Sequence, residues 1–149
     1  MKKNFIWWGL TILWCGVIFY MSAKTGDESS MDSGWAAQIL NSVAEFLTGR
    51  EDAEIPVLLI RKAAHYTEYF ILGILLYMSF YNYKKPEAKI LEPAAAGIFY
   101  AITDEVHQYF VPGRAMQAFD VAIDALGVLS SICLLFCISR IRAAAQKSD

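Results

Sequence analysis

Charge is scarce in this sequence: Asp, Glu, Lys and Arg make up 19% of its 149 residues, whereas about a quarter is usual for a soluble domain. Apolar residues make up 56%, and the mean hydropathy is +0.36. A chain of this length forms a single domain, here residues 1–149. The missing charge and the surplus of apolar side chains indicate that lipid surrounds much of the chain.

A surplus of basic residues is also missing. The net charge is −2 and the pI is about 5.7, which removes the usual electrostatic basis for binding nucleic acid. The three cysteines all lie inside apolar runs, and an odd number at such positions does not form a disulfide framework. The sequence has no G-x-S-x-G motif, no internal repeat and no low-complexity tract.

Four apolar segments approach the length of about 20 residues that spans a bilayer. They cover residues 5–23, 56–80, 92–111 and 118–139. Pro56 and Pro93 fall where the first turn of a helix is expected, and Pro112-Gly113 marks a stop. The first segment resembles a signal peptide but is long for one, so we expect a retained helix. The sequence therefore predicts an all-α fold, an integral membrane bundle of four transmembrane helices.

In this arrangement the basic residues near the segment ends fall on one side of the membrane. They are Lys2, Lys3, Lys84, Lys85, Lys89, Arg140, Arg142 and Lys147. Because cytoplasmic loops carry an excess of Lys and Arg, we expect a multi-pass protein of the plasma membrane with both termini in the cytoplasm. Residues 24–55 and 112–117 would then face outward.

The first outward segment contains a short amphipathic pattern over residues 34–47. Apolar residues from Trp35 to Phe46 recur at helical spacing, and Asp32 or Ser33 is placed to cap the helix. We expect this helix to lie on the outer leaflet or over the bundle. It would serve as a structural lid or, alternatively, as a lipid sensor.

Ionisable residues converge at the outer ends of the last three segments. They are Arg61, Lys62, His65 and Glu68 in the second segment, Asp104 and Glu105 in the third, Arg114 in the turn, and Asp120 and Asp124 in the fourth. Since a charge at the centre of a membrane helix costs about 2.5–3.5 kcal/mol, we expect these side chains to face one another across a polar cavity. Five carboxylates against three cations also predict a protonated carboxyl, a charged His65 or a bound cation. Structural ion pairing is the alternative.

The residue types in this cluster suggest its chemistry. If the protein is an enzyme, four of them would supply the acid and base. These four are His65, Glu68, Asp104 and Glu105. An anionic ligand would be bound by the cations and the neighbouring polar residues. These are Arg61, Lys62, Tyr69, Gln108, Arg114, Asp120 and Asp124. Alternatively, the basic residues contact lipid headgroups at the membrane interface.

A metal site has little support in the sequence. The chain has only two histidines, and His107 projects away from Glu105 and Gln108 on a helical wheel. His65 and Glu68 have the i, i+3 spacing of carboxylate-bridged metal sites, but no further nitrogen ligand is nearby. We therefore predict neither a metal nor a cofactor.

Three blocks of the sequence resemble the signature blocks of the VanZ-like family. They are R-K-A-A-H-Y-T-E-Y-F-I-L-G, D-E-V-H-Q-Y-F-V-P-G-R and D-V-A-I-D-A-L-G, in this order between residues 57 and 130. The positions that match the family pattern are Lys62, His65, Glu68, Tyr69, Asp104, Glu105, Gln108, Pro112, Gly113, Arg114, Asp120 and Gly127. The chain differs at Gln117, where the family has a small polar residue, and at Asp124, where it often has Asn.

The resemblance implies a small bacterial membrane protein, in a family named after an accessory factor in teicoplanin resistance. Three functions then fit the expected cavity. The first is binding of an anionic lipid-linked envelope component or a lipoglycopeptide, with a contribution to glycopeptide resistance. The second is hydrolysis or group transfer on a lipid-linked substrate. The third is proton-coupled transport of a small solute, for which four helices per protomer would require a homodimer.

Overall fold

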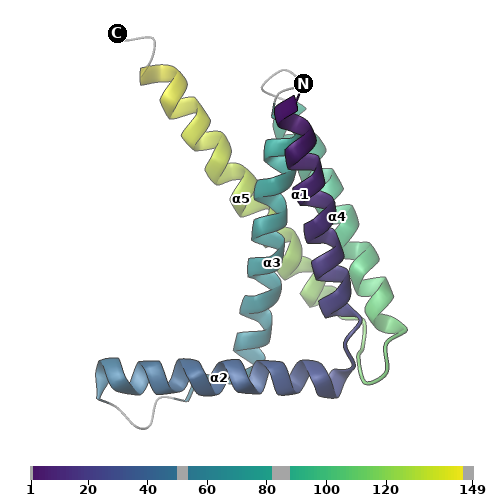
Figure 1. Ribbon diagram of the computed structural model, residues 1–149, viewed down its shortest axis with the longest axis vertical. Helices are drawn as coiled ribbons and strands as arrows, with labels where there is room; N and C mark the ends of the chain where they lie inside the picture. Colours follow the sequence, from purple (N-terminus) through teal and green to yellow (C-terminus); the bar gives the residue numbers. More distant parts are fainter. Residues whose placement is uncertain (1, 50–53, 82–87, 146–149) are drawn as a thin grey trace.

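The computed structural model describes residues 2–49, 54–81 and 88–145, and within them it contains five helices and no strand. The helices are α1 (Lys2–Ser22), α2 (Gly26–Thr48), α3 (Val57–Phe80), α4 (Ala88–Tyr109) and α5 (Ala118–Ala145). Figure 1 shows α1, α3, α4 and α5 as a bundle and α2 lying crosswise over one end of it. The predicted all-α fold is confirmed.

Helix α3 is the centre of the bundle. It packs most extensively against α5, and also against α1, α4 and α2. Its buried positions recur every three or four residues and include Tyr69, Leu72 and Leu76, so one face of the helix meets its neighbours. Val128 and Ile132 of α5 complete the middle of this core. The bundle is therefore organised around the contact between α3 and α5.

A glycine permits the closest approach of these two helices. A Cβ added at Gly127 of α5 would lie 2.6 Å from the carbonyl oxygen of Tyr66 and 3.0 Å from the backbone nitrogen of Phe70. Both contacts are with the backbone of α3, which no rotamer change can move away. The two helix axes can therefore come this close only if position 127 carries no side chain.

Two of the helices have the length and composition of membrane spans, namely α1 over Phe5–Ser22 and α5 over Ala118–Arg142. The other two long helices of the bundle, α3 and α4, fall short of that standard. Their polar residues, among them His65 and Glu68 in α3, lower the hydropathy of the segments. The expectation of four apolar spans is thus met by two helices, and the other two carry the polar cluster.

Three predicted helix boundaries were wrong. Helix α2 begins at Gly26 and not near residue 34, because Thr25 and not Asp32 or Ser33 caps it. Helix α4 begins at Ala88, so that Pro93 lies inside the helix. There the proline cannot donate the backbone hydrogen bond that a residue at this position would give to residue 89. The last helix runs on to residue 145, past the predicted end at 139.

The start of α1 and the end of α5 lie at the same end of the bundle, opposite α2 (Figure 1). An even number of spans requires such an arrangement. The predicted assignment of this end to the cytoplasm rests on the positions of the basic residues, and it stays a prediction.

The glycine contact leads to a stability prediction. Replacing Gly127 by Ala should lower the thermal midpoint of the purified protein by several degrees, because overpacking costs about 1–3 kcal/mol. The matched control is Gly16→Ala, since an added Cβ at that position of α1 meets nothing within 4 Å. Thermal unfolding in detergent measures both variants. An unchanged midpoint for Gly127→Ala would contradict the close packing of α3 and α5.

Candidate functional site

A polar cavity of about 210 Å³ lies between α2 and the end of the bundle. Helix α2 contributes Ser29, Asp32, Ser33 and Ala36 to it, and the other lining residues come from α1, α3, α4, the turn after α4 and the connection between α1 and α2. Its ionisable side chains are Lys24, Asp32, Arg61, His65, Glu68, Asp104 and Arg114. Ionisable side chains from separate helices thus meet at one site, as predicted. Helix α2 covers this site and is called its roof below.

Two guanidinium groups line the cavity. Arg114 donates hydrogen bonds to the carbonyl oxygens of Lys24 and Met21, at 2.9 and 3.3 Å, and to Oε1 of Gln108 at 3.0 Å. Burial lowers the pKa of the Arg114 guanidinium, and the positive charge of Arg61 lowers it further. Arg61 is half-buried and has no hydrogen bond or ion pair within the described residues. One side of the cavity therefore holds two cations, and one of them has no partner in the part of the chain that the structure describes.

The carboxylates of the cavity lie deeper along the helices. Oδ2 of Asp104 accepts a hydrogen bond from Nε2 of Gln108 at 3.2 Å. Because Gln108 also accepts a hydrogen bond from Arg114, the three side chains form a continuous hydrogen-bonded series. The other oxygen of Asp104 and the hydroxyl of Tyr69 are buried, and among the described residues neither forms a hydrogen bond of standard geometry, although the two groups interact with each other. Glu68 lines the cavity seven residues after Arg61 on α3, about 10 Å further along the helix axis. On α3 the basic Arg61 thus lies nearer to α2, and the acidic Glu68 lies further into the bundle.

His65 lines the cavity between Arg61 and Glu68. Its Nδ1 lies 3.4 Å from Oδ1 of Asp124, a residue of α5 that is fully buried behind it. Since Nδ1 is directed toward Asp124, Nε2 is the ring nitrogen left for the cavity. A histidine next to a buried carboxylate resembles the arrangement that orients a general base, although the two atoms at 3.4 Å do not have hydrogen-bond geometry in this structure.

Five of the predicted site residues are not part of the cavity lining, namely Lys62, Tyr69, Glu105, Asp120 and Asp124. Oε1 of Glu105 accepts a hydrogen bond from the backbone N–H of Gln117 at 2.6 Å, which holds the start of α5. Lys62 forms an ion pair with Asp120 and lies over the ring of Phe119. These contacts join α3 and α4 to the beginning of α5. The contact of Lys62 with Asp120 is the structural ion pairing that the sequence left open, whereas Glu105 binds the backbone before α5.

His107, the second histidine, is also outside the cavity. Its ring stacks on Phe19 with 4.4 Å between the ring centroids, and its Nδ1 lies 3.3 Å from Oγ of Ser22. Within residues 2–49, 54–81 and 88–145, no group of three or more His, Cys, Asp or Glu side chains is arranged to hold a metal ion. All three cysteines are free.

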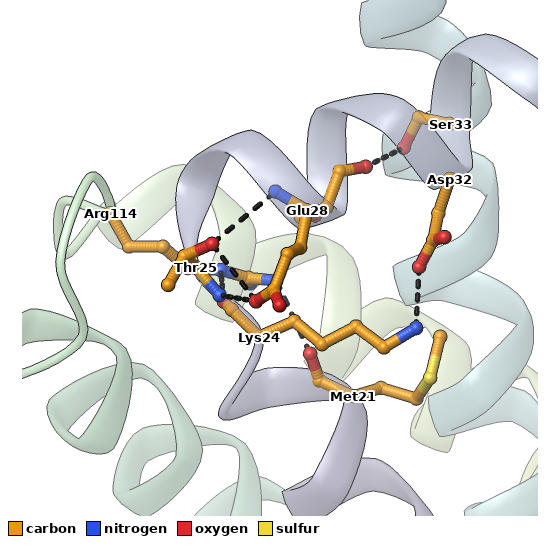
Figure 2. Close-up of polar contacts among 8 residues, drawn as sticks. Met21, Lys24, Thr25, Glu28, Asp32, Ser33 and Arg114 are labelled. Carbon is orange, nitrogen blue, oxygen red and sulfur yellow. Dashed lines mark hydrogen bonds and ion pairs between the residues drawn. The ribbon is translucent and has the colours of Figure 1, made fainter.

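Contacts around Thr25 fix the start of α2, as Figure 2 shows. The side chain of Thr25 accepts from the N–H of Glu28, and the N–H of Thr25 donates to the Glu28 carboxylate at 2.9 Å, which lowers the pKa of Glu28. Lys24 pairs with Asp32 at 2.5 Å, and that hydrogen bond raises the pKa of Lys24. The predicted helix start near residue 34 missed these residues, although the spacing Thr-x-x-Glu is the sequence signal of a capping box.

Two glycines hold α2 against the turn that follows α4. The N–H of Gly26 donates to the carbonyl oxygen of Pro112 at 3.0 Å. A Cβ at Gly26 would lie 2.1 Å from the carbonyl oxygen of Gly113, and Gly113 itself has a φ of +75°. This backbone contact and the hydrogen bonds of Arg114 form a latch between the start of α2 and the turn, named here the α2 latch.

The fold and the cavity define a small α-helical membrane protein with a polar cavity closed by a crosswise helix. A family model described as VanZ/LLP1 matches residues 7–140, and the chain therefore belongs to the VanZ/LLP1 family. No curated protein and no solved structure matches the chain.

The α2 latch can be tested with one substitution. We expect Gly26→Ala to force α2 away from the turn and to speed tryptic cleavage after Lys24, because the new methyl group would overlap the Gly113 carbonyl. Gly34→Ala in the same helix is the control: an added Cβ there meets nothing within 4 Å, and alanine favours a helix by about 1 kcal/mol over glycine. Equal cleavage rates in the two variants would exclude the latch.

Proposed function

We propose that this protein binds the anionic headgroup of a membrane lipid or lipid-linked envelope component in the cavity beneath α2. The observation that carries the proposal is Arg61, a half-buried guanidinium that lines the cavity with no partner in the described chain and lies close to a second guanidinium, that of Arg114. Two adjacent cations repel each other, and an anion between them removes that repulsion. A phosphate group suits such a site because guanidinium groups bind it in a bidentate manner.

The volume of the cavity favours a headgroup over a larger ligand. Drug-sized ligands occupy pockets of about 300–1,000 Å³. At about 210 Å³ the cavity is suited to a phosphate with a small substituent, and it is too small to enclose a lipoglycopeptide. A role in teicoplanin-type resistance accordingly rests on the family resemblance, and we propose it only as a consequence of binding an envelope component.

The position of the cavity supports a ligand that lies in the membrane. It opens beneath α2 at one end of the bundle, where the membrane-embedded helices meet a helix with exposed apolar residues such as Trp35 and Phe46. That is the depth at which lipid headgroups lie. With the predicted orientation, the site would face the outer leaflet.

Arg61 supplies the test of binding. In nanodiscs, Arg61→Ala should weaken the binding of tetradecyl phosphate about 10- to 100-fold, since a hydrogen bond to a charged group contributes about 1.5–3 kcal/mol. Arg142→Ala is the control, because Arg142 is an exposed arginine near the far end of α5. Microscale thermophoresis measures both. Equal affinities of Arg61→Ala and the parent protein would refute an anion site at Arg61.

Acid–base catalysis on the same ligand is a second candidate, and the contact of His65 with Asp124 favours it. Nε2 of His65 would take a proton from a water molecule that attacks phosphorus. Glu68, on the same wall of the cavity, would give a proton to the leaving oxygen. Binding alone would need neither the buried carboxylate next to His65 nor an acid in the cavity.

The two histidines of the chain make a matched pair for testing catalysis. If the protein hydrolyses tetradecyl phosphate, His65→Asn should lower phosphate release about 10²- to 10⁴-fold and preserve binding. His107→Asn should leave the rate unchanged, because His107 lies outside the cavity. Phosphate release is followed by a colorimetric assay. Binding of the ester by the parent protein without any release of phosphate would reject hydrolysis and leave the binding function in place.

A further inference from the structure

An apolar groove of about 380 Å³ runs along the outside of α3 and adjoins the polar cavity. We infer that this groove holds a hydrocarbon chain of the ligand, and that the ligand reaches the cavity sideways from the bilayer, between α1 and α3. The inference rests on the proposed function, since it describes the lipid part of the ligand whose headgroup occupies the cavity.

The groove and the cavity are parts of one surface. Ile60, Ala64 and Glu68 of α3 line both of them. Leu40 of α2 borders the groove near the membrane surface, and Trp14 of α1 borders it on the other side. A molecule with its charged end beside Arg61 would therefore extend directly into the groove.

The length of the groove matches one leaflet. From Ile60 to Ile71 it follows twelve residues of α3, which are eleven steps and about 16 Å along the helix axis. The hydrocarbon core of a bilayer is about 30 Å thick, so the groove crosses about half of it. The groove begins at headgroup depth and ends near the bilayer centre, as the chain of a lipid in one leaflet does.

The lining of the groove suits a hydrocarbon chain and not a peptide. The indole N–H of Trp14 already donates to the carbonyl oxygen of Glu68 at 2.9 Å. The hydroxyl of Thr67 already donates to the carbonyl oxygen of Ala63 at 2.7 Å, so this residue presents its methyl group. Ala63 itself leaves room because its side chain is small. A peptide backbone in the groove would find few polar partners, whereas a hydrocarbon chain needs none.

Helix α2 determines the direction of access. It lies crosswise over the end of the bundle (Figure 1), and its start is held by the α2 latch. Ala63 and Thr67, by contrast, are exposed on the side of α3 that faces lipid. The open path to the cavity therefore leads from the bilayer and not through the roof.

The experiment compares two ligands that share a headgroup, butyl phosphate and tetradecyl phosphate, with inorganic phosphate as a third. Ala63→Phe should fill the groove, lower the affinity for tetradecyl phosphate at least 10-fold and leave butyl phosphate unaffected. Ala122→Phe is the control, because Ala122 is an exposed alanine on α5 that lines neither the groove nor the cavity. Unspecific partitioning of tetradecyl phosphate into the nanodisc is the same for both variants, so it cancels in the comparison. Inorganic phosphate bound as tightly as tetradecyl phosphate would overturn the inference in favour of a free anion.

The possible failures point to different conclusions. If Ala63→Phe and Ala122→Phe bind tetradecyl phosphate equally, the groove is not a chain site, and the headgroup function stands. If Arg61→Ala binds both alkyl phosphates as the parent does, the proposed function itself fails. Because Ala63→Phe could also fold poorly, a tetradecyl phosphate carrying a diazirine on its chain gives a second measurement. Photolabelling of Trp14 or Ile71 supports the inference, and labelling confined to the groove between α4 and α5, near Leu91 and Phe136, overturns it.

Discussion

An ionisable side chain within the apolar part of a membrane must find polar partners, and this constraint determines how α3, α4 and α5 are placed. Some of the charged residues form closed contacts that hold the helices together, such as the pair of Lys62 with Asp120 and the bond from Gln117 to Glu105. The remaining ones surround a cavity. The same residues keep α3 and α4 from having the composition of ordinary membrane spans, so the polar site and the lower hydropathy of these two helices have a single cause.

A cavity of this kind needs a cover at the end of the bundle. Here α2 is that cover, and its position depends on a few backbone contacts at its first residue. Gly26 meets Pro112 and Gly113, and Arg114 binds two carbonyl oxygens next to it. Arg114 was predicted as an anion clamp, and in the structure it uses three of its five N–H groups to hold this junction and Gln108. The proposed ligand site at Arg61 and the closure of α2 are next to each other, because Arg61 and Arg114 line the same cavity.

The sequence was sufficient to predict the helical fold, the family and the convergence of charge on one site, because helical spacing and the cost of charge in lipid act locally. It could not show which charged residue meets which. Spacing places Glu105 and Asp104 within a few residues of the same helix end, but only the path of the turn reveals that Glu105 faces the backbone of Gln117. The start of α2 was missed because the apolar pattern was given more weight than the capping signal of Thr25 and Glu28.

The cavity and the groove together are charged at one end and apolar at the other, as a lipid molecule is. Arg61 lies at the end of α3 that α2 covers, His65 and Glu68 lie about one and two turns further along α3, and the apolar lining of the groove continues toward Ile71. A ligand with a charged end and a hydrocarbon chain fits this gradient in one orientation only, with its headgroup under α2. Its phosphate would then lie beside Arg61 and above the ring of His65. The orientation that the membrane imposes on a lipid would thus position the ligand for binding and, if the protein is an enzyme, for reaction, without further contacts to select it.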